Sequence, residues 1–349
     1  MRIIKTKNYD EMSKAAANII AAQITLKPDS VMGFATGSTP IGTYAELIKK
    51  NQNGDIDFSN INTVNLDEYK DLPITHDQSY YYFMNDNLFN HVNIDKNNTN
   101  LPNGNAEDPD AECARYEALI KELGGIDMQL LGLGHNGHIG FNEPGSQFSS
   151  QTRLVLLDNN SKEDARVLFG NTEQVPVSAI TMGIDTIMQA KEVALVAWGD
   201  HKAGVVKAAI ETPFSTACPA SVLQQHKNAQ VVIDLSAASS LTRINQPWVV
   251  TSCEWDDQLI RRAVVWLCQQ INKPILKLTN KDYNDFGLSE LITQFGSAYN
   301  CNIKVFNDLQ HTITGWPGGK PNADDTNRPE RAKPFPKDIV IFSPHPDDD

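Results

Sequence analysis

The stretch IDMQLLGLGHNGHIGFNEPG, residues 126–145, decides how this chain folds. Its first nine residues form a short apolar run, which is typical of a strand buried on both faces. The run ends in the loop 134–145, which holds four glycines, two histidines, two asparagines and a glutamate. A loop with so many polar groups does not belong in a core, so we expect it at the exposed end of the strand.

Further apolar runs alternate with helical patterns along the chain. Strands are expected at 30–35, 62–66, 192–199 and 229–235, and helices at 40–50, 110–124 and 201–211. Short buried strands with helices between them indicate an α/β fold with a mostly parallel, doubly wound sheet and flanking helices. Ligands bind such sheets at the carboxyl ends of the strands, where the loop 134–145 is also expected.

The character of the sequence changes after residue 245. We expect a first domain over 1–245 and a C-terminal connector over 246–313, with amphipathic helices at 255–271 and 285–299. Residues 314–337 are rich in proline, glycine, asparagine and aspartate, as linkers are. Residues 338–349 start a new strand, so a smaller C-terminal α/β extension is expected.

Composition excludes several classes of protein. The chain has 349 residues, 40% of them hydrophobic, and can bury a sizeable core. It has no run of about 18 apolar residues and no apolar stretch typical of a signal peptide near its start, so neither a membrane span nor secretion is expected. Five scattered cysteines without a CxxC pair fit the reducing cytoplasm. The net charge of −13 argues against a nucleic-acid partner and means that an anionic substrate would need a dense local set of donors.

The segment ATGSTP, residues 35–40, could supply such donors. Thr39 suits the N-cap of the following helix, Pro40 its first turn, and Gly37 lets a ligand approach the backbone. Amides and hydroxyls would then face an anion at the positive end of the helix. The candidate anion ligands are Thr36, Gly37, Ser38 and Thr39. An ordinary capped turn explains the same residues, and the lack of GK[ST] excludes a Walker loop.

Two further motifs carry groups that can move protons. Asp67, in NLDEYKDL (65–72), follows a strand and could act as a general base or cap the next helix. In the loop 134–145, His138 is a candidate proton carrier, as histidines often are, and Glu143 or Asn136 could orient it in a proton relay. A polar turn with solvated side chains stays open. A metal site formed with His135 is disfavoured because the spacing matches no standard zinc signature.

Residues 1–240 resemble the glucosamine-6-phosphate deaminases, because TGSTP, NLDEY, GHNGHIGFNEPGS and GDHKA occur in that family's order and at nearly its intervals. The resemblance implies an enzyme that converts glucosamine 6-phosphate and water to fructose 6-phosphate and ammonium, without a metal or other cofactor. It also implies a cytoplasmic homo-oligomer that acts in amino-sugar catabolism. Asp67 matches the base that moves a proton from C2 to C1, and His138 matches the group that opens the sugar ring. Glu143 and Asn136 match the partners of that histidine.

The resemblance also assigns the phosphate contacts. The segment 36–39 matches the family's phosphate loop, Lys202 matches one cationic contact, and Arg166 matches a second after a one-residue gap. Residues 155–180 match the lid that closes over the sugar. Two rival functions are a 6-phosphogluconolactonase-like hydrolase and an inactive sugar-phosphate-binding regulator. The resemblance disfavours the first because those lactonases lack the glutamate of the NEP motif, here Glu143, and the second because Asp67, His138 and Glu143 are all present.

Three positions depart from the family pattern or extend it. Some members carry aspartate where this chain has Asn136, so an altered pH profile is expected rather than lost activity. Val155 replaces a lysine found in members that N-acetylglucosamine 6-phosphate activates, although Ser146 and Arg153 remain, so this activation is not expected. Residues 343–349, SPHPDDD, resemble the first motif of zinc-dependent LmbE-like N-acetylglucosamine deacetylases. There His345 and Asp348 match zinc ligands and Asp347 the base; we expect a truncated piece of such a domain.

Overall fold

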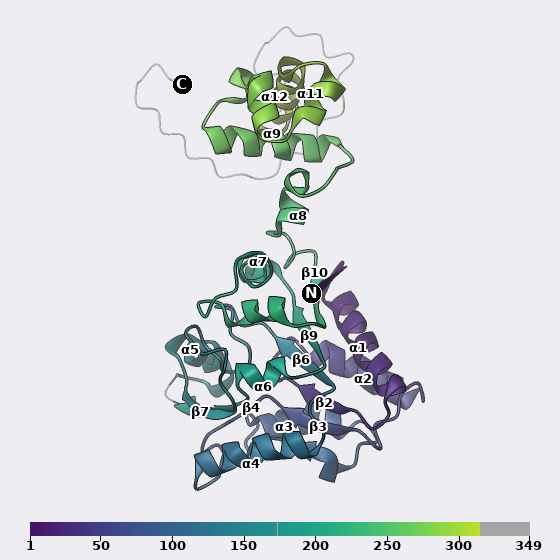
Figure 1. Ribbon diagram of the computed structural model, residues 1–349, viewed down its shortest axis with the longest axis vertical. Helices are drawn as coiled ribbons and strands as arrows, with labels where there is room; N and C mark the ends of the chain where they lie inside the picture. Colours follow the sequence, from purple (N-terminus) through teal and green to yellow (C-terminus); the bar gives the residue numbers. More distant parts are fainter. Residues whose placement is uncertain (173, 315–349) are drawn as a thin grey trace. The chain divides into compact units, whose positions relative to one another are not determined.

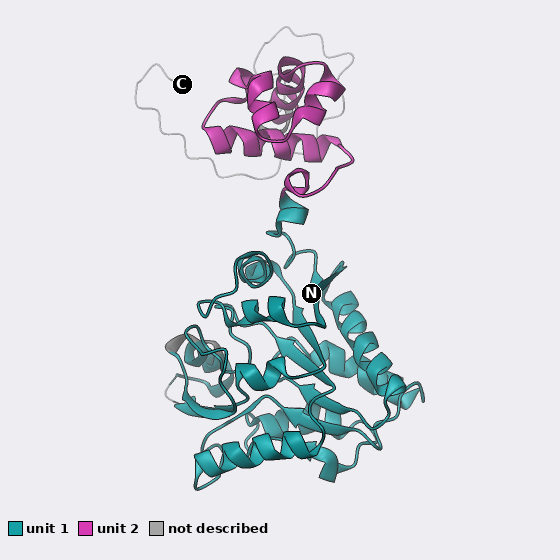
Figure 2. Ribbon diagram, in the orientation of Figure 1, with its two compact units in different colours: residues 1–245 teal, residues 246–349 magenta. Residues whose placement is uncertain are grey.

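The computed structural model describes residues 1–172 and 174–314. The chain forms two compact units, Met1–Asn245 and Gln246–Asp349, shown in different colours in Figure 2. Each unit has apolar clusters of its own. The two units are therefore described separately.

A seven-stranded parallel sheet forms the centre of the first unit (Figure 1). The strands pair in the order β1-β10-β9-β6-β2-β3-β5. Their bounds are Arg2–Thr6 (β1), Val31–Phe34 (β2), Asn62–Asn65 (β3), Thr99–Asn100 (β5), Met128–Gly132 (β6), Glu192–Ala197 (β9) and Ala229–Asp234 (β10). The chain winds outward from β2 through β3 to β5, and then from β6 through β9 to β10 in the opposite direction. The switch point, where α/β sheets bind ligands, therefore lies between β2 and β6.

Helices cover both faces of this sheet. On one face, α1 (Tyr9–Leu26) and α2 (Ile41–Gln52) contribute to one apolar cluster. On the other face, α4 (Pro109–Glu122), α6 (Ile184–Met188) and α7 (Ala203–Glu211) contribute to a second. This arrangement confirms the mostly parallel, two-sided α/β fold that the sequence predicted.

Local sequence explains where two of these helices begin. The Asn8 side chain accepts a hydrogen bond from the Glu11 amide at 3.0 Å, which caps α1. The Asp108 side chain accepts from the amides of Asp110 and Ala111, and Pro109 occupies the first turn of α4. These caps satisfy amides that have no partner within the helix.

A second, three-stranded sheet carries part of the site. It is antiparallel, with the order β4-β8-β7, and its strands span Asp67–Tyr69 (β4), Ser178–Thr181 (β8) and Arg153–Leu156 (β7). Helix α5 (Asn159–Phe169) lies between β7 and β8 in the chain, and α3 (Tyr80–Met84), followed by a π turn at Asn85–Phe89, comes after β4. Because β4 directly follows β3 and pairs with β8, Asp67 lies opposite Thr181.

The described part of the second unit consists of helices and 3₁₀ turns. Its α-helices are α9 (Asp257–Ile271), α10 (Asn280–Asp285), α11 (Ser289–Phe295) and α12 (Ala298–Thr314), while α8 (Thr242–Asn245) ends the first unit. Trp248, Leu267 and Tyr283 belong to its apolar cluster. Short 3₁₀ turns occur along the chain at Lys96–Asn98, Asp200–Lys202, Pro219–Gln225, Pro247–Val249 and Ile275–Lys277. No helix among the described residues has the length and apolar content needed to cross a membrane.

Several boundaries differ from the sequence-based expectations. The single helix predicted at 285–299 is wrong, because the chain breaks at Gly287 and Gly296, whose φ angles are 75° and 76°. Glycine adopts this left-handed conformation readily, and it ends helices. The N-cap of α2 is Pro40 rather than Thr39, and no side chain caps that helix. The linker and the strand expected beyond residue 314, with the deacetylase-like motif of His345, Asp347 and Asp348, lie outside the described residues.

Candidate active site

The loop 134–145 leaves the carboxyl end of β6 and is shaped by its glycines. The His138 imidazole lies against Gly134, where a Cβ atom would come within 2.3 Å of the ring. Gly137 has a φ of 90°, and a Cβ atom there would come within 2.5 Å of the Cys218 sulfur. The loop therefore needs glycine at both positions. Gly134 leaves room for the His138 imidazole, and Gly137 leaves room for the Cys218 sulfur.

Buried polar contacts fix the second half of this loop. The Asn142 amide group donates to the carbonyl oxygens of Ile139 at 2.8 Å and Met182 at 2.9 Å. The Arg153 guanidinium, from β7, donates to Asn142 Oδ1 at 2.8 Å and Ser146 Oγ at 3.3 Å. Asn142 is fully buried, so these bonds hold the loop rigidly against the small sheet. Arg153 thus has a structural partner in the loop.

His138, Glu143 and Asn136 come together within this loop. His138 Nδ1 lies 3.4 Å from Glu143 Oε2, an ion-pair distance at which the ring N–H is not aligned for a hydrogen bond. Asn136 Nδ2 donates to the same Oε2 atom at 2.7 Å, and the His138 amide donates to Asn136 Oδ1 at 3.1 Å. Asn136 therefore bonds to the carboxylate of Glu143 and to the backbone of His138.

Glu143 is an anion by virtue of its surroundings. Burial alone would raise the pKa of this carboxyl. The neighbouring His138 and the hydrogen bonds from Ser161 and Asn136 outweigh burial and lower the pKa to about 2. The charged carboxylate lies 3.4 Å from His138 Nδ1 and gives that nitrogen an anionic neighbour. The pair can therefore hold a proton and pass it to a bound molecule.

Asp67 is the first residue of β4 in the small sheet, two residues after the carboxyl end of β3 in the large sheet. Its side chain is buried, and a Cβ atom at Gly140 would lie 3.3 Å from its Oδ2 atom, so the carboxylate borders the histidine loop. Burial, and then the charge of Glu68, raise the pKa of Asp67 to about 8. A carboxylate with so high a pKa is a much stronger base than an exposed one.

Glu68, next to Asp67, has a different role. Its Oε1 accepts from the amides of Tyr69 and Tyr80, and its Oε2 accepts from the amide of Tyr81, each at 2.9 Å. The carboxylate thereby holds the first turn of α3. Tyr80 in turn stacks on Phe141 of the histidine loop, with ring centroids 6.1 Å apart.

The segment 36–39 lies at the carboxyl end of β2, on the other side of the switch point. Gly37 has a φ of 96° and, like Ser38, is exposed. The Tyr9 hydroxyl lies 3.2 Å from the Thr39 carbonyl oxygen and accepts from the Gly42 amide at 2.9 Å. Tyr9 therefore braces this loop from α1, and no side chain caps the start of α2.

The two expected cations have different surroundings. Lys202 Nζ donates to the Leu133 carbonyl oxygen at 2.9 Å, which places its charge where β6 enters the histidine loop. Arg166, on α5, forms an ion pair of 2.6 Å with Glu163, and about half of its side chain is exposed. Among the described residues no hydrogen bond or ion pair joins Arg166 to the segment 36–39 or to Lys202.

No metal-ligand cluster is found within 1–172 and 174–314. No three His, Cys, Asp or Glu side chains lie close enough there to share an ion. The set of His135, His138 and Glu143 considered from sequence does not form one. His135 is exposed, and its ring centroid lies 6.3 Å from that of His138.

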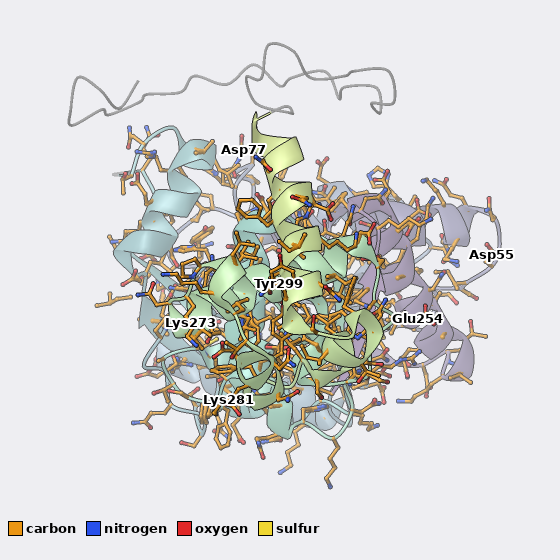
Figure 3. The ribbon with its side chains drawn as sticks, turned by 90° about the horizontal axis from the view of Figure 1, so that it is seen from above. Asp55, Asp77, Glu254, Lys273, Lys281 and Tyr299 are labelled. Atoms are coloured by element: carbon orange, nitrogen blue, oxygen red, sulfur yellow. The ribbon has the colours of Figure 1, made fainter. Side chains whose placement is uncertain are left out.

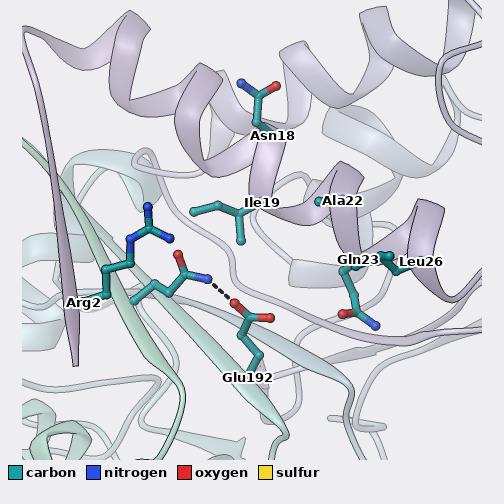
Figure 4. A pocket seen from close by; sticks show the side chains of 8 residues that line it. Arg2, Asn18, Ile19, Ala22, Gln23, Leu26 and Glu192 are labelled. Atoms are coloured by element: carbon teal, nitrogen blue, oxygen red, sulfur yellow. Dashed lines mark hydrogen bonds between the residues drawn. The ribbon is translucent and has the colours of Figure 1, made fainter.

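A surface hollow elsewhere in the first unit is not this site. Figure 4 shows it between α1 and the first residues of β1, β9 and β10, where Gln230 bonds Glu192. It is lined by Arg2, Asn18, Ile19, Ala22, Gln23, Leu26, Glu192 and Gln230. Because the strands are parallel, this hollow lies at their amino ends, opposite the edge that carries Asp67 and His138.

Two residues of the site carried no signal in the sequence. Tyr9 looks like an ordinary first residue of a helix, and Ser161 lies in the unremarkable segment DNNSKED. In the fold, Ser161 Oγ donates to Glu143 Oε1, and Tyr9 braces the segment 36–39. Both contacts join parts that are far apart in the chain, so no local pattern could have predicted them.

Comparison with known proteins gives a consistent picture. The family described as glucosamine-6-phosphate isomerases/6-phosphogluconolactonase matches residues 5–233. A glucosamine-6-phosphate deaminase-like protein of Bacteroides thetaiotaomicron is 54% identical over 99% of this chain, which spans only 54% of that protein's length. A glucosamine-6-phosphate deaminase of Clostridium perfringens is 52% identical over 69% of this chain and 100% of its own. The solved structure of a monomeric glucosamine-6-phosphate deaminase matches 69% of this chain and 100% of its own, with 45% identity and a TM-score of 0.68.

Proposed function

The chain belongs to the family of glucosamine-6-phosphate isomerases and 6-phosphogluconolactonases, and we propose that its first unit is a glucosamine-6-phosphate deaminase. The reaction converts glucosamine 6-phosphate and water to fructose 6-phosphate and ammonium. The observation that carries the proposal is the placement of Asp67, a buried carboxylate of raised pKa, against the loop that carries His138 and Glu143. The similarity to named deaminases over residues 1–245 supports the same assignment.

The groups suffice for each proton transfer that this reaction needs. His138, supported by Glu143, moves a proton from the C1 hydroxyl to the ring oxygen and so opens the sugar ring. Asp67 then removes the proton from C2, which is acidic because it lies next to the aldehyde, and returns it to C1. As C1 takes up this proton, one proton also passes from the amino group to the C1 oxygen, which leaves an imine at C2 and a hydroxyl group at C1. Water adds to that carbon, ammonium leaves, and the ketone of fructose 6-phosphate remains.

The phosphate is assigned to the opposite side of the switch point. Amides and hydroxyls of the segment 36–39 face an anion at the start of α2, and Lys202 supplies a positive charge near the histidine loop. Arg166 would join them only after it leaves Glu163. These donors form the dense local set that a chain of net charge −13 needs for an anionic substrate.

A coupled assay for ammonium and fructose 6-phosphate tests the proposal. Asp67→Asn removes the base and should lower kcat by about 10²–10⁴-fold, the usual worth of general acid–base catalysis. Asp55→Asn is the matched control, because Asp55 is exposed (labelled in Figure 3) and follows α2, away from the strand ends that carry the site. No ammonium release by the wild-type protein would overturn the function, and a fully active Asp67→Asn protein would overturn the role of the base.

The same assay separates the alternatives. Hydrolysis of 6-phosphogluconolactone in place of ammonium release would identify a lactonase, and tight binding of the sugar phosphate without turnover would identify a regulator. The buried carboxylate of Asp67 favours the deaminase, because lactone hydrolysis moves no proton between carbons.

Three properties of the whole protein stay predictions. The resemblance implies a homo-oligomer, whereas one solved relative is described as monomeric; a mass of about 38.6 kDa in solution would contradict self-association. The five cysteines are unpaired, which supports a reducing, cytoplasmic location. The acidic net charge supports the lack of a nucleic-acid partner.

A further inference from the structure

Glu143 is held from two sides, by elements that are separate in the chain. Its Oε2 atom accepts from Asn136 Nδ2 at 2.7 Å and lies 3.4 Å from His138 Nδ1. Its Oε1 atom accepts from Ser161 Oγ. Asn136 and His138 belong to the same loop as Glu143, but Ser161 lies in helix α5.

Ser161 is placed by the fold to make this one contact. Its side chain is 7% exposed, and its hydroxyl belongs to the first turns of α5. The last residue of the helix, Phe169, packs edge-on against Tyr69 at 5.5 Å and stacks on His76 at 5.7 Å between ring centroids. Helix α5 is thus anchored at one end by aromatic packing and at the other by the bond to Glu143.

We propose that Ser161 is a positioning residue for the acid–base pair, which acts through Glu143 and touches no substrate atom. With both oxygens bonded, the carboxylate has a single orientation, and Oε2 faces the imidazole. Without the hydroxyl, Oε1 loses its donor, and the carboxyl group is free to rotate about its last side-chain bond. His138 would then lose a fixed partner for its proton. The expected kinetic effect rests on the proposed function, whereas the contact between Ser161 and Glu143 does not.

Kinetics of Ser161→Ala distinguish this role from a merely structural one. A hydrogen bond to a charged group is worth about 10- to 100-fold in rate when it acts in the reaction, so kcat should fall by that factor. KM should change by less than about threefold, because the segment 36–39 and Lys202 belong to other elements, and Arg166, although on α5, is paired with Glu163. Ser161→Thr keeps the hydroxyl and should recover most of kcat. Val167→Ala, an exposed position on the same helix, is the matched control and should leave kcat unchanged.

Hydrogen exchange tests the contact without substrate. Backbone amides of α5 should exchange faster in Ser161→Ala than in the wild type, and Val167→Ala and Ser161→Thr should leave the exchange close to wild type. Equal exchange in all four proteins would overturn the contact. A Ser161→Ala enzyme with wild-type kcat, or with a change in KM alone, would overturn the positioning role. If the wild type released no ammonium, the proposed function would fail, while the exchange experiment would still decide whether Ser161 anchors the helix.

Discussion

At the scale of single residues, the surroundings of Asp67 determine when the enzyme can work. A base must lose its proton before it can act, and the pKa of Asp67 is raised to about 8 by burial and by Glu68. We therefore expect kcat/KM to rise with pH and to level off above about pH 8, since kcat/KM reports the free enzyme. A profile measured from pH 6 to pH 9.5 checks this, and a flat profile above pH 6 would contradict it.

The same raised pKa has a consequence for stability. Because the folded protein binds this proton more tightly than the unfolded chain does, the contribution of Asp67 to stability falls as the pH rises from about 4 toward 8. In Asp67→Asn the buried side chain carries no charge at any pH, so this loss of stability at high pH should be absent. We expect its melting temperature to exceed that of the wild type by about 2–4 °C or more at pH 9, the effect of roughly 1 kcal/mol, and the gap to close near pH 4. Asp55→Asn is the control; an unstable Asp67→Asn protein at pH 9 would contradict the expectation.

Asn136 gives a second test at this scale. Asn136→Asp replaces the donor to Glu143 Oε2 by a second carboxylate at the same place, so the pKa of Glu143 should rise from about 2. The rise of kcat/KM toward pH 8 belongs to Asp67, so the change is expected in a second, more acidic limb set by Glu143, which should move upward by about one pH unit or more. Asn136→Ala loses the donor without adding charge and should give a smaller shift. Identical profiles for wild type and Asn136→Asp would show that the amide does not tune the pair.

At the scale of elements, Glu68 links the short strand β4 to helix α3. It accepts three backbone amide bonds, and its charge raises the pKa of Asp67. In Glu68→Gln an NH₂ group replaces one of the two accepting oxygens, so at least one backbone amide that bonds to Glu68 loses its acceptor. The free energy of unfolding should therefore fall by about 1–3 kcal/mol. The pH at which kcat/KM levels off should also fall, since a negative charge beside Asp67 is gone.

Thermal melting and a pH profile measure the two effects of Glu68→Gln separately. Glu254→Gln, on the exposed surface in Figure 3, is the control for the change from carboxylate to amide. A Glu68→Gln protein that melts like the wild type would show that α3 does not depend on this carboxylate. An unshifted profile would show that Asp67 does not respond to the charge.

The strands and helices also show where the expectations from sequence agree with the structure and where they fail. The alternation of apolar strands and helices predicted β2, β3, β6, β9 and β10 because each is a local run. The second sheet was not predicted, since β4, β7 and β8 have only three or four residues each and pair across distant parts of the chain. The helix predicted at 285–299 failed for a local reason, the left-handed glycines at 287 and 296.

At the scale of the whole molecule, the candidate site belongs to one unit. Asp67, His138 and Lys202 all lie within Met1–Asn245, which has its own apolar clusters. A protein of residues 1–245 should therefore melt cooperatively and keep kcat/KM within about twofold of the full chain, as independent domains do. Calorimetry and the coupled assay measure both. A loss of activity greater than about tenfold would show that the second unit supports the site.

The sequence by itself determined which groups could do chemistry and at which strand ends they lie. Strand runs and glycine positions are local properties, and they made Asp67, His138, Glu143 and the segment 36–39 candidates, while the resemblance to a known family assigned their roles. Only the tertiary structure decided how these groups act on one another. Burial raised the pKa of Asp67, the fold turned Asn136 toward Glu143, and helix α5 brought Ser161 to the same carboxylate. These outcomes depend on solvent exclusion and on partners distant in the chain, which no stretch of sequence contains.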